Sequence, residues 1–310
     1  MRTWMSWAAV TPFAVWAAIR WSGFEPDWPW VPAVAFTPYA AAAAVLALGL
    51  ALLLRRRAAV LVALAAAVAL GVAVLPRALP DGGGPAAKGP ELRVLAANLM
   101  VGMADPARLV ALVEELKPDV LALQELTPKA LDRLEGEGLR DLLPHAVTRP
   151  LPGVGGSAVY ARHPLTPGQA IQYGPFGQAR AFLAHPHAGR IEVVSVHPCA
   201  PKRYGRAPCW RQGLEALPRG GGGPLRLLAG DFNATLDHLP VRDLLADGYR
   251  DAADAAGHGL RATWPQGGWG PFGVTIDHVL ADERMGVTDF RVLSLGGTDH
   301  RPVFATLRLP

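Results

Sequence analysis

The 310-residue sequence has few charges in its first quarter and no net charge in the remainder. Val31 to Leu54 is a run of 24 residues without a charged side chain, and Ala58 to Leu75 is a further run of 18. Residues 91–310 hold 23 Lys or Arg and 23 Asp or Glu, so the net charge of +4 belongs to residues 1–90. A protein that binds a nucleic acid backbone over many contacts normally carries a basic excess. The composition therefore argues against bulk nucleic acid as a partner.

Cysteine is also scarce, since Cys199 and Cys209 are the only two. No CxxC motif and no His/Cys zinc spacing is present. The pair lies ten residues apart, and a disulfide between them would persist outside the cytoplasm; two free thiols are the alternative. Residues Gly220 to Gly223 lack a following Gly-Lys-Ser/Thr, so we interpret them as a flexible turn and not as a phosphate-binding loop.

The uncharged runs predict membrane-spanning helices, because a helix needs about 20 mainly apolar residues to cross a bilayer. We expect a transmembrane region over residues 1–75, with spans at about 3–21, 31–54 and 58–75. The first contains Pro12, and a cleaved signal peptide is its alternative. Residues 76–90 are rich in Pro and Gly and are expected to be a linker, followed by a domain over 91–310.

The distribution of charge predicts the orientation of these spans. Arg55, Arg56 and Arg57 separate the second and third spans and should stay in the cytoplasm. The loop from Ser22 to Trp30 has Glu25, Asp27 and two Trp but no Lys or Arg, which suits the outer interface. Residues 91–310 should then lie outside the cytoplasm, in a multi-pass protein of the cell membrane.

Residues 91–310 alternate between β-rich runs and stretches with helical spacing, which is typical of an α/β fold. Helices are predicted at Ala104–Leu116, Pro128–Glu135, Cys209–Leu217 and Pro240–Ala246. Strands are predicted at Leu92–Asn98, Asp119–Leu123, Ser157–Tyr160, Ile191–Val196, Leu225–Leu228, Thr275–Leu280 and Val303–Leu307.

Polar side chains follow six of the apolar runs. They are Asn98, Glu125, His197, Asp231 with Asn233, Asp277 with His278, and Asp299 with His300. One such residue is usually a turn cap, but six in series predict a shared site at one edge of a sheet. Carboxylates brought together raise each other's pKa unless a cation neutralises them. Oxygen ligands suit Mg²⁺ or Mn²⁺.

These residues lie in motifs that resemble the endonuclease/exonuclease/phosphatase superfamily, which has the DNase I-like fold. The motifs occur in the family's order and comprise Asn98, Leu123-Gln124-Glu125-Leu126, Gly230-Asp231-Phe232-Asn233, Ile276-Asp277-His278-Val279 and Thr298-Asp299-His300-Arg301-Pro302-Val303. The resemblance covers nearly all of residues 91–310. It implies a four-layer α/β sandwich of two sheets flanked by helices.

The resemblance also implies roles for individual residues. Glu125 would bind the metal with support from Asn98 and Asp299, and Asp231 would orient or deprotonate the attacking water or help to hold a second metal. Asn233 and His300 would contact the phosphate, with His300 oriented by Asp277. His197 matches the second catalytic histidine of the branch that includes DNase I and sphingomyelinases. Three positions depart from the family pattern, namely Thr298, Pro198 and Ala161. His278 is expected to be structural, and the remaining histidines are expected on the surface or in loops: His145, His163, His185, His187, His238 and His258.

Together these features predict a membrane-anchored, metal-dependent hydrolase of phosphate ester or pyrophosphate bonds. The layout resembles the VanJ-type membrane proteins of this superfamily, which implies a lipid-linked substrate such as undecaprenyl pyrophosphate. An extracytoplasmic nuclease or a sphingomyelinase-like phosphodiesterase is the alternative. A non-catalytic binding module is a third interpretation, against which the presence of Glu125, Asp231 and His300 argues. No obligate protein partner is evident.

Overall fold

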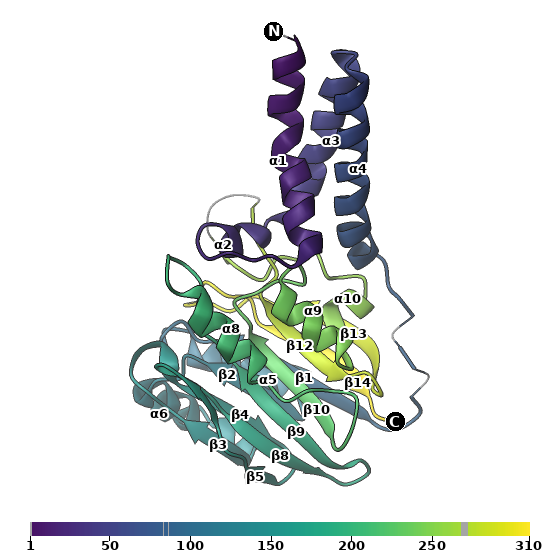
Figure 1. Cartoon of the computed structure of the whole chain (residues 1–310). Coiled ribbons are helices and arrows are strands. Elements are labelled where there is room, and N and C mark those ends of the chain that lie inside the picture. The colour runs from purple at the N-terminus through teal and green to yellow at the C-terminus, as the bar shows by residue number, and fades with distance from the viewer. Residues whose placement is uncertain (1, 83, 86, 268–271) are drawn as a thin grey trace.

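The computed structural model describes residues 2–82, 84–85, 87–267 and 272–310. Two six-stranded sheets pack face to face in the part that follows residue 90 (Figure 1). The first sheet has the order β13 (Gly286–Val292), β14 (Val303–Arg308), β1 (Glu91–Asn98), β2 (Val120–Gln124), β4 (Ser157–Ala161) and β3 (His145–Arg149). The second has the order β11 (Tyr249–Asp251), β12 (Asp277–Asp282), β10 (Leu225–Asp231), β9 (Gly189–Val196), β8 (Arg180–His185) and β5 (Leu165–Pro167). Strands β6 (Ile171–Tyr173) and β7 (Phe176–Gln178) form a separate pair.

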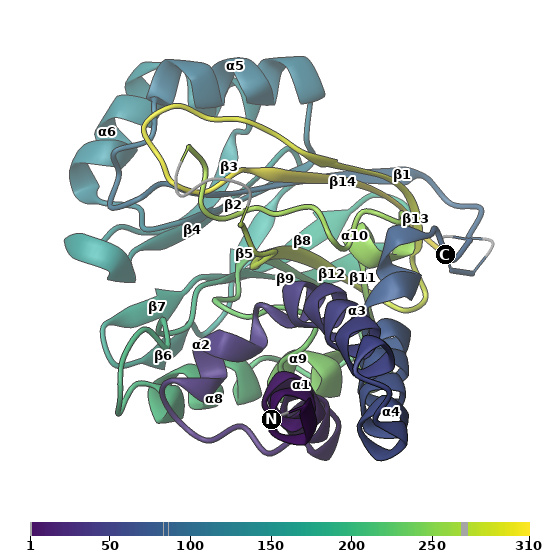
Figure 2. The ribbon, with the colours of Figure 1, turned by 90° about the horizontal axis from the view of Figure 1, so that it is seen from above.

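Helices cover the outer faces of both sheets, as the view in Figure 2 shows. On the first sheet lie α5 (Pro106–Leu116), α6 (Pro128–Gly136) and α7 (Leu139–Leu142); on the second lie α8 (Ala207–Glu215) and α9 (Leu239–Ala246). The short α10 (Ala252–Ala255) follows β11. Residues such as Val94, Val193 and Leu227 fill the space between the sheets. The α/β sandwich that the resemblance implied is confirmed.

Parallel pairing in the centre of each sheet brings several strand ends to one edge. In the first sheet Asn98 of β1 is in register with Gln124 of β2. In the second, Gly230 of β10 is in register with Val196 of β9, and antiparallel pairing sets Asp231 opposite Asp277. The polar residues that follow these strands therefore meet above the same edge of the sandwich.

Residues 2–74 form three packed helices that project from the sandwich (Figure 1). They are α1 (Arg2–Ser22), α3 (Thr37–Leu53) and α4 (Arg57–Val74), with the short α2 (Trp30–Val34) between the first two and the 3-10 turn η1 (Leu75–Ala78) after the last. Among the described residues, one helix, Arg57–Ala78, is long and apolar enough to cross a membrane, and Thr37–Leu53 is a shorter apolar helix. Of the three expected spans, one is therefore supported by length and composition.

The helices are docked on the sandwich and are not joined to it by a free coil. Asp237, which is fully buried, accepts hydrogen bonds from Arg20 Nε at 2.7 Å and from both terminal nitrogens of Arg77 at 2.7 and 2.8 Å. The Val31 side chain is fully buried in the apolar cluster beneath α8. Pro80, in the expected linker, forms a β-bridge with Ala256. Two residues of the expected linker, Arg77 and Pro80, therefore contact the sandwich directly.

One expectation for the histidines is wrong, because His185 is buried in β8. His238 lies in a loop just before α9, as expected, but it is buried, with its Nε2 atom 2.8 Å from the Val31 carbonyl oxygen. The partner of the His238 Nε2 atom is distant in the sequence, and the partners of His185 are backbone N–H groups. The residues that flank either histidine therefore do not indicate that it is buried. His278 is buried between Asp251 and the Ala234 carbonyl, which is a structural position as expected.

Candidate active site

The strand ends surround a cleft of about 620 Å³, and the predicted site residues lie in or beside it. Six of them line it: Glu125, His197, Asp231, Asn233, Asp299 and His300. The other two, Asn98 and Asp277, are buried behind Asp231 and His300 and contact them directly. The structure thus brings together residues spread over more than 200 positions of the chain.

Two carboxylates converge on the Asn98 amide. Asn98 Nδ2 lies 3.0 Å from Asp231 Oδ2 and 3.3 Å from Glu125 Oε1. Burial raises the pKa of Glu125, although hydrogen bonds from the Val101 N–H and from Asn98 oppose it. Burial also raises the pKa of Asp231, with the Asp277 charge adding to the effect. Two buried carboxylates that are both costly to ionise form a site that a cation would stabilise.

The donor set fits a hard divalent cation. Glu125 and Asp231 offer carboxylate oxygens, and Asp299 lies close enough to raise the pKa of Glu125. Asn98 Oδ1 accepts the Met100 N–H at 2.9 Å, so Asn98 would bind a metal only after its amide turns. Oxygen donors of this kind are those that Mg²⁺ and Mn²⁺ prefer.

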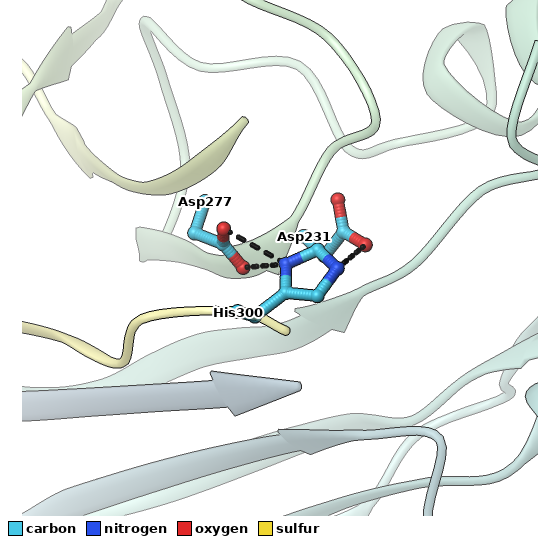
Figure 3. A group of neighbouring side chains, drawn as sticks. All are labelled: Asp231, Asp277 and His300. Atoms are coloured by element: carbon cyan, nitrogen blue, oxygen red, sulfur yellow. Dashed lines mark hydrogen bonds and ion pairs between the residues drawn. The ribbon is translucent and has the colours of Figure 1, made fainter. Parts of the chain in front are cut away.

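Figure 3 shows His300 held between two carboxylates, Asp277 and Asp231. Its Nδ1 lies 3.0 and 3.1 Å from the Asp277 oxygens, and its Nε2 lies 3.7 Å from Asp231 Oδ2. Burial by itself would lower the pKa of His300, but Asp277 and Asp231 outweigh it and raise the pKa to about 10. The donor atoms of the three residues are close enough to hold a metal ion. A protonated imidazole has no lone pair to offer a metal, however, so we interpret the group as a charge-paired imidazolium.

His197 approaches the same carboxylates from the other side. Its Nε2 lies 3.5 Å from Asp231 Oδ2 and 3.7 Å from Glu125 Oε1. The ring packs edge-on against Phe176, and the His197 N–H donates to Gln178 Oε1. Burial lowers the pKa of His197, and the opposing charge of Asp231 does not compensate. The site therefore pairs a neutral imidazole with a charged one.

Several backbone positions around the cleft are strained. Glu125 has φ 56° and Asn233 has φ 48°, and Met100 and Val101 are also left-handed. Residues other than glycine rarely adopt this conformation, and such outliers cluster at functional sites. At Asn233 the bend lets the backbone N–H donate to Asp231 Oδ1 at 2.8 Å.

Sequence reasoning missed three groups that shape the site. Trp264 Nε1 donates to Asp299 Oδ2 at 2.9 Å, which orients that carboxylate. The Thr298 hydroxyl donates to the Asn98 carbonyl and accepts the His300 N–H. Lys202, Arg203 and Arg206 line the cleft from the loop that the Cys199–Cys209 disulfide closes. Only the Thr298 hydroxyl had a sequence signal, through the motif that contains it.

Comparison with known proteins agrees with this geometry. The family model described as the Endonuclease/Exonuclease/phosphatase family matches residues 97–300. No curated protein sequence matches the chain.

Solved structures share the fold at low identity. An endonuclease/exonuclease/phosphatase from Beutenbergia cavernae is 19% identical, with a TM-score of 0.53 over 71% of this chain and 72% of that one. Humanized D. rerio TDP2 is 15% identical, with a TM-score of 0.54 over 70% and 98% of the two chains. An AP endonuclease from Archaeoglobus fulgidus is 17% identical, with a TM-score of 0.53 over 69% and 98%.

With a matching family model across the whole site, the chain belongs to the endonuclease/exonuclease/phosphatase family, whose members are hydrolases of phosphoester bonds that use divalent metals.

Proposed function

We propose that the protein is a membrane-anchored, Mg²⁺- or Mn²⁺-dependent phosphoesterase that acts outside the cytoplasm on a lipid-linked phosphate or pyrophosphate. The observation that carries the proposal is the convergence of Glu125, Asp231 and His300, with Asn98, His197 and Asp277, on one cleft. The family match supports hydrolysis of a phosphoester bond as the reaction. The apolar helices docked beside the cleft favour a lipid-linked substrate.

The residues divide the hydrolysis between them. Asp231 takes a proton from water, since a buried carboxylate with a raised pKa is a stronger base than usual. The water oxygen forms a bond to phosphorus as the bond from phosphorus to the leaving oxygen breaks. His300, which stays protonated at neutral pH, gives its proton to that leaving oxygen. Asn233 and His197 contact the phosphoryl oxygens.

Glu125 and Asp299 would hold the metal, and Asn98 would join them once its amide turned. When bound, it offsets negative charge that develops on the phosphoryl group. Whether Mg²⁺ or Mn²⁺ is used in the cell depends on supply as well as on affinity.

Exposed apolar side chains on the projecting helices support the membrane anchor. On α3 and α4 they include Leu46, Leu53, Leu61, Val68 and Val72, each more than half exposed. At 1.5 Å per residue the 21 residues of α1 span about 31 Å, close to the apolar thickness of a bilayer. A soluble surface rarely carries an apolar patch of this extent.

The position of the basic turn supports the orientation. Arg55 to Arg57, between α3 and α4, lie at the end of the bundle away from the sandwich (Figure 1). Trp21, Phe24 and Trp28 are exposed at the opposite end, beside the sandwich. The positive-inside rule and the preference of aromatic residues for the interface then favour a catalytic domain outside the cytoplasm.

A nuclease is the second candidate, because D. rerio TDP2 is known in complex with a single-strand DNA product and shares the fold. The neutral charge of residues 91–310 counts against it.

The test uses the full chain purified in detergent micelles. We expect phosphate release from a polyprenyl pyrophosphate to be faster than cleavage of plasmid or single-stranded DNA. EDTA should abolish turnover, and added Mg²⁺ or Mn²⁺ should restore it. Faster cleavage of DNA would favour the nuclease, and full activity in EDTA would exclude the metal.

A further inference from the structure

One wall of the catalytic cleft comes from the N-terminal helical region and not from the sandwich. Pro32, Ala35 and Phe36, around the end of α2 and the start of α3, line the cleft together with the catalytic residues. The rings of Phe36, Tyr39 and Phe272 follow one another, with centroids 6.0 and 5.3 Å apart. We call these three residues the aromatic strip. Phe36 is 38% exposed and Phe272 is 58% exposed, so the strip is open to a ligand.

This wall is fixed in place by contacts with the catalytic domain. The Val31 side chain is buried in the core, and the Val31 carbonyl lies 2.8 Å from His238 Nε2. The Tyr39 hydroxyl donates to the Gly273 carbonyl at 2.7 Å and accepts the Gly273 N–H. Because the Tyr39 side chain and the Val31 backbone are both held, the centre of the strip is preformed.

A different part of the cleft is basic. Lys202, Arg203 and Arg206 line it from the disulfide loop, and no ion pair joins them to a carboxylate within the described ranges. The loop is tied to the N-terminal region, since the Gly205 N–H donates to Asp27 Oδ2 at 2.5 Å. The cleft therefore presents free cations and apolar rings to the same ligand, which suits an anionic amphiphile.

We infer that the aromatic strip binds the apolar chain of the substrate and that Phe36 determines specificity for long-chain phosphates. The phosphoryl group lies by Glu125 and His300, its charge faces the basic loop, and the chain leaves over Phe36. This inference rests on the proposed function and deepens it. Phe36 directly precedes α3, whose exposed aliphatic side chains continue the apolar path away from the cleft. A polynucleotide carries a phosphate at every nucleotide and has no continuous apolar chain that would follow that path.

The test compares two substrates with the same diphosphate head, a five-carbon prenyl diphosphate and a long polyprenyl diphosphate, on the full chain in micelles. Phe36→Asp should raise KM for the long substrate at least tenfold and raise KM for the short one much less. Phe36→Leu should restore the long-chain KM. Phe24→Asp, which changes an exposed ring outside the cleft, should leave KM for both substrates unaltered.

The outcomes separate the two proposals. If Phe36→Asp raises KM equally for both substrates, or for neither, the inference is overturned while the assignment as a phosphoesterase stands. The same holds if the variant selectively impairs cleavage of single-stranded DNA, which would assign the strip to base stacking. Wild-type protein that turns over neither diphosphate would overturn the proposed function and this inference with it. Should Phe36→Asp not fold, Phe36→Gln takes its place in the same comparison.

Discussion

His197 and His300 face the same Asp231 oxygen, yet their surroundings drive their pKa values in opposite directions. His300 has Asp277 at its other nitrogen, and its pKa is raised to about 10. His197 has an aromatic ring against it and is buried, and its pKa is lowered. An acid and a hydrogen-bonding neutral group are thus available at one pH, which a pair of solvent-exposed histidines would not provide.

Replacing either imidazole should therefore cost catalysis and not folding. We expect His300→Ala and His197→Ala each to lower kcat by about 10²–10⁴-fold, the range for loss of a positioned acid, base or charge-stabilising group. Steady-state phosphate release measures this, with thermal melting as a check on folding. His187→Ala, which removes an exposed histidine far from the cleft, is the matched control. Near wild-type turnover in a cleft variant would refute its role.

The site residues at the ends of the central strands were predictable, because the family motifs lie where these strands end at the edge of the sandwich. Asn98 ends β1 and Glu125 follows β2, so pairing within the first sheet brings these two together. Asp231 ends β10 of the second sheet and reaches them because the two sheets pack face to face. His238 and Trp264 were not predictable in the same way. Their partners, the Val31 carbonyl and the Asp299 carboxylate, lie 207 and 35 residues away and belong to no local pattern.

Among the elements, the loop that begins at Cys199 is closed by a covalent bond that reduction can break. The Cys199–Cys209 disulfide is present, with Cα atoms 5.8 Å apart, and it closes the loop that holds Lys202, Arg203 and Arg206 beside the cleft. Mass spectrometry of non-reduced peptides from membrane-derived protein should find this pair bridged. Two free thiols would contradict both the bridge and the extracytoplasmic location.

Removing the bridge should loosen this wall more than it damages the chemistry. Closing a ten-residue loop is worth about 3 kcal/mol on the chain-entropy model. We expect the Cys199→Ser, Cys209→Ser double variant to melt at a lower temperature and to show a higher KM with a smaller change in kcat. Unchanged melting and unchanged KM would show that α8 and the Asp27–Gly205 hydrogen bond hold the loop without it.

Long buried strands were predicted well and short edge strands were not. β1, β9 and β10 bury both faces and read as continuous apolar runs. β3 is only half-buried and β5 has three residues, so neither carries a clear alternation. β3 pairs with β4 and β5 pairs with β8, so these tertiary contacts, and not the local sequence pattern, specify the two edge strands. The helix predicted at Cys209–Leu217 is α8, which begins and ends two residues earlier, at Ala207 and Glu215.

At the scale of the whole molecule, one buried carboxylate joins the helices to the catalytic domain. Burial by itself would raise the pKa of Asp237, but hydrogen bonds and charge from Arg77 and Arg20 outweigh it and lower the pKa. A carboxyl with a depressed folded-state pKa stabilises the fold above its unfolded value, about 3.9, and that contribution is lost as pH falls further. Acid should therefore weaken this interface.

Asp237→Asn should lower stability by about 3–5 kcal/mol at neutral pH, because it leaves Arg20 and Arg77 buried without a counter-charge. Thermal melts of wild type and variant should differ most above pH 5 and converge below pH 4. Asp247→Asn is the matched control, since its partner Arg219 is half exposed and the pair should contribute little. If the difference in melting temperature persisted unchanged at low pH, the ion triad formed by Asp237, Arg20 and Arg77 would not be its source.

The same interface predicts that residues 91–310 are not independent. A fragment starting at residue 91 loses Val31 from the core, Arg77 from Asp237 and Phe36 from the cleft. We expect it to aggregate or to melt well below the full chain, as judged by size-exclusion chromatography and thermal melting. A monomeric fragment with the full-length melting temperature would show that the helices are only an anchor.

The ion triad also has a consequence for the order in which the protein is made. Asp237 follows Arg20 by 217 residues and Arg77 by 160, so the ribosome completes both arginines long before their common counterion. Chains generally fold from the N-terminal end during synthesis. If α1 and α4 lie in the bilayer as proposed, the two guanidinium groups stay in water at the outer surface until the segment after β10 is exported and Asp237 reaches them.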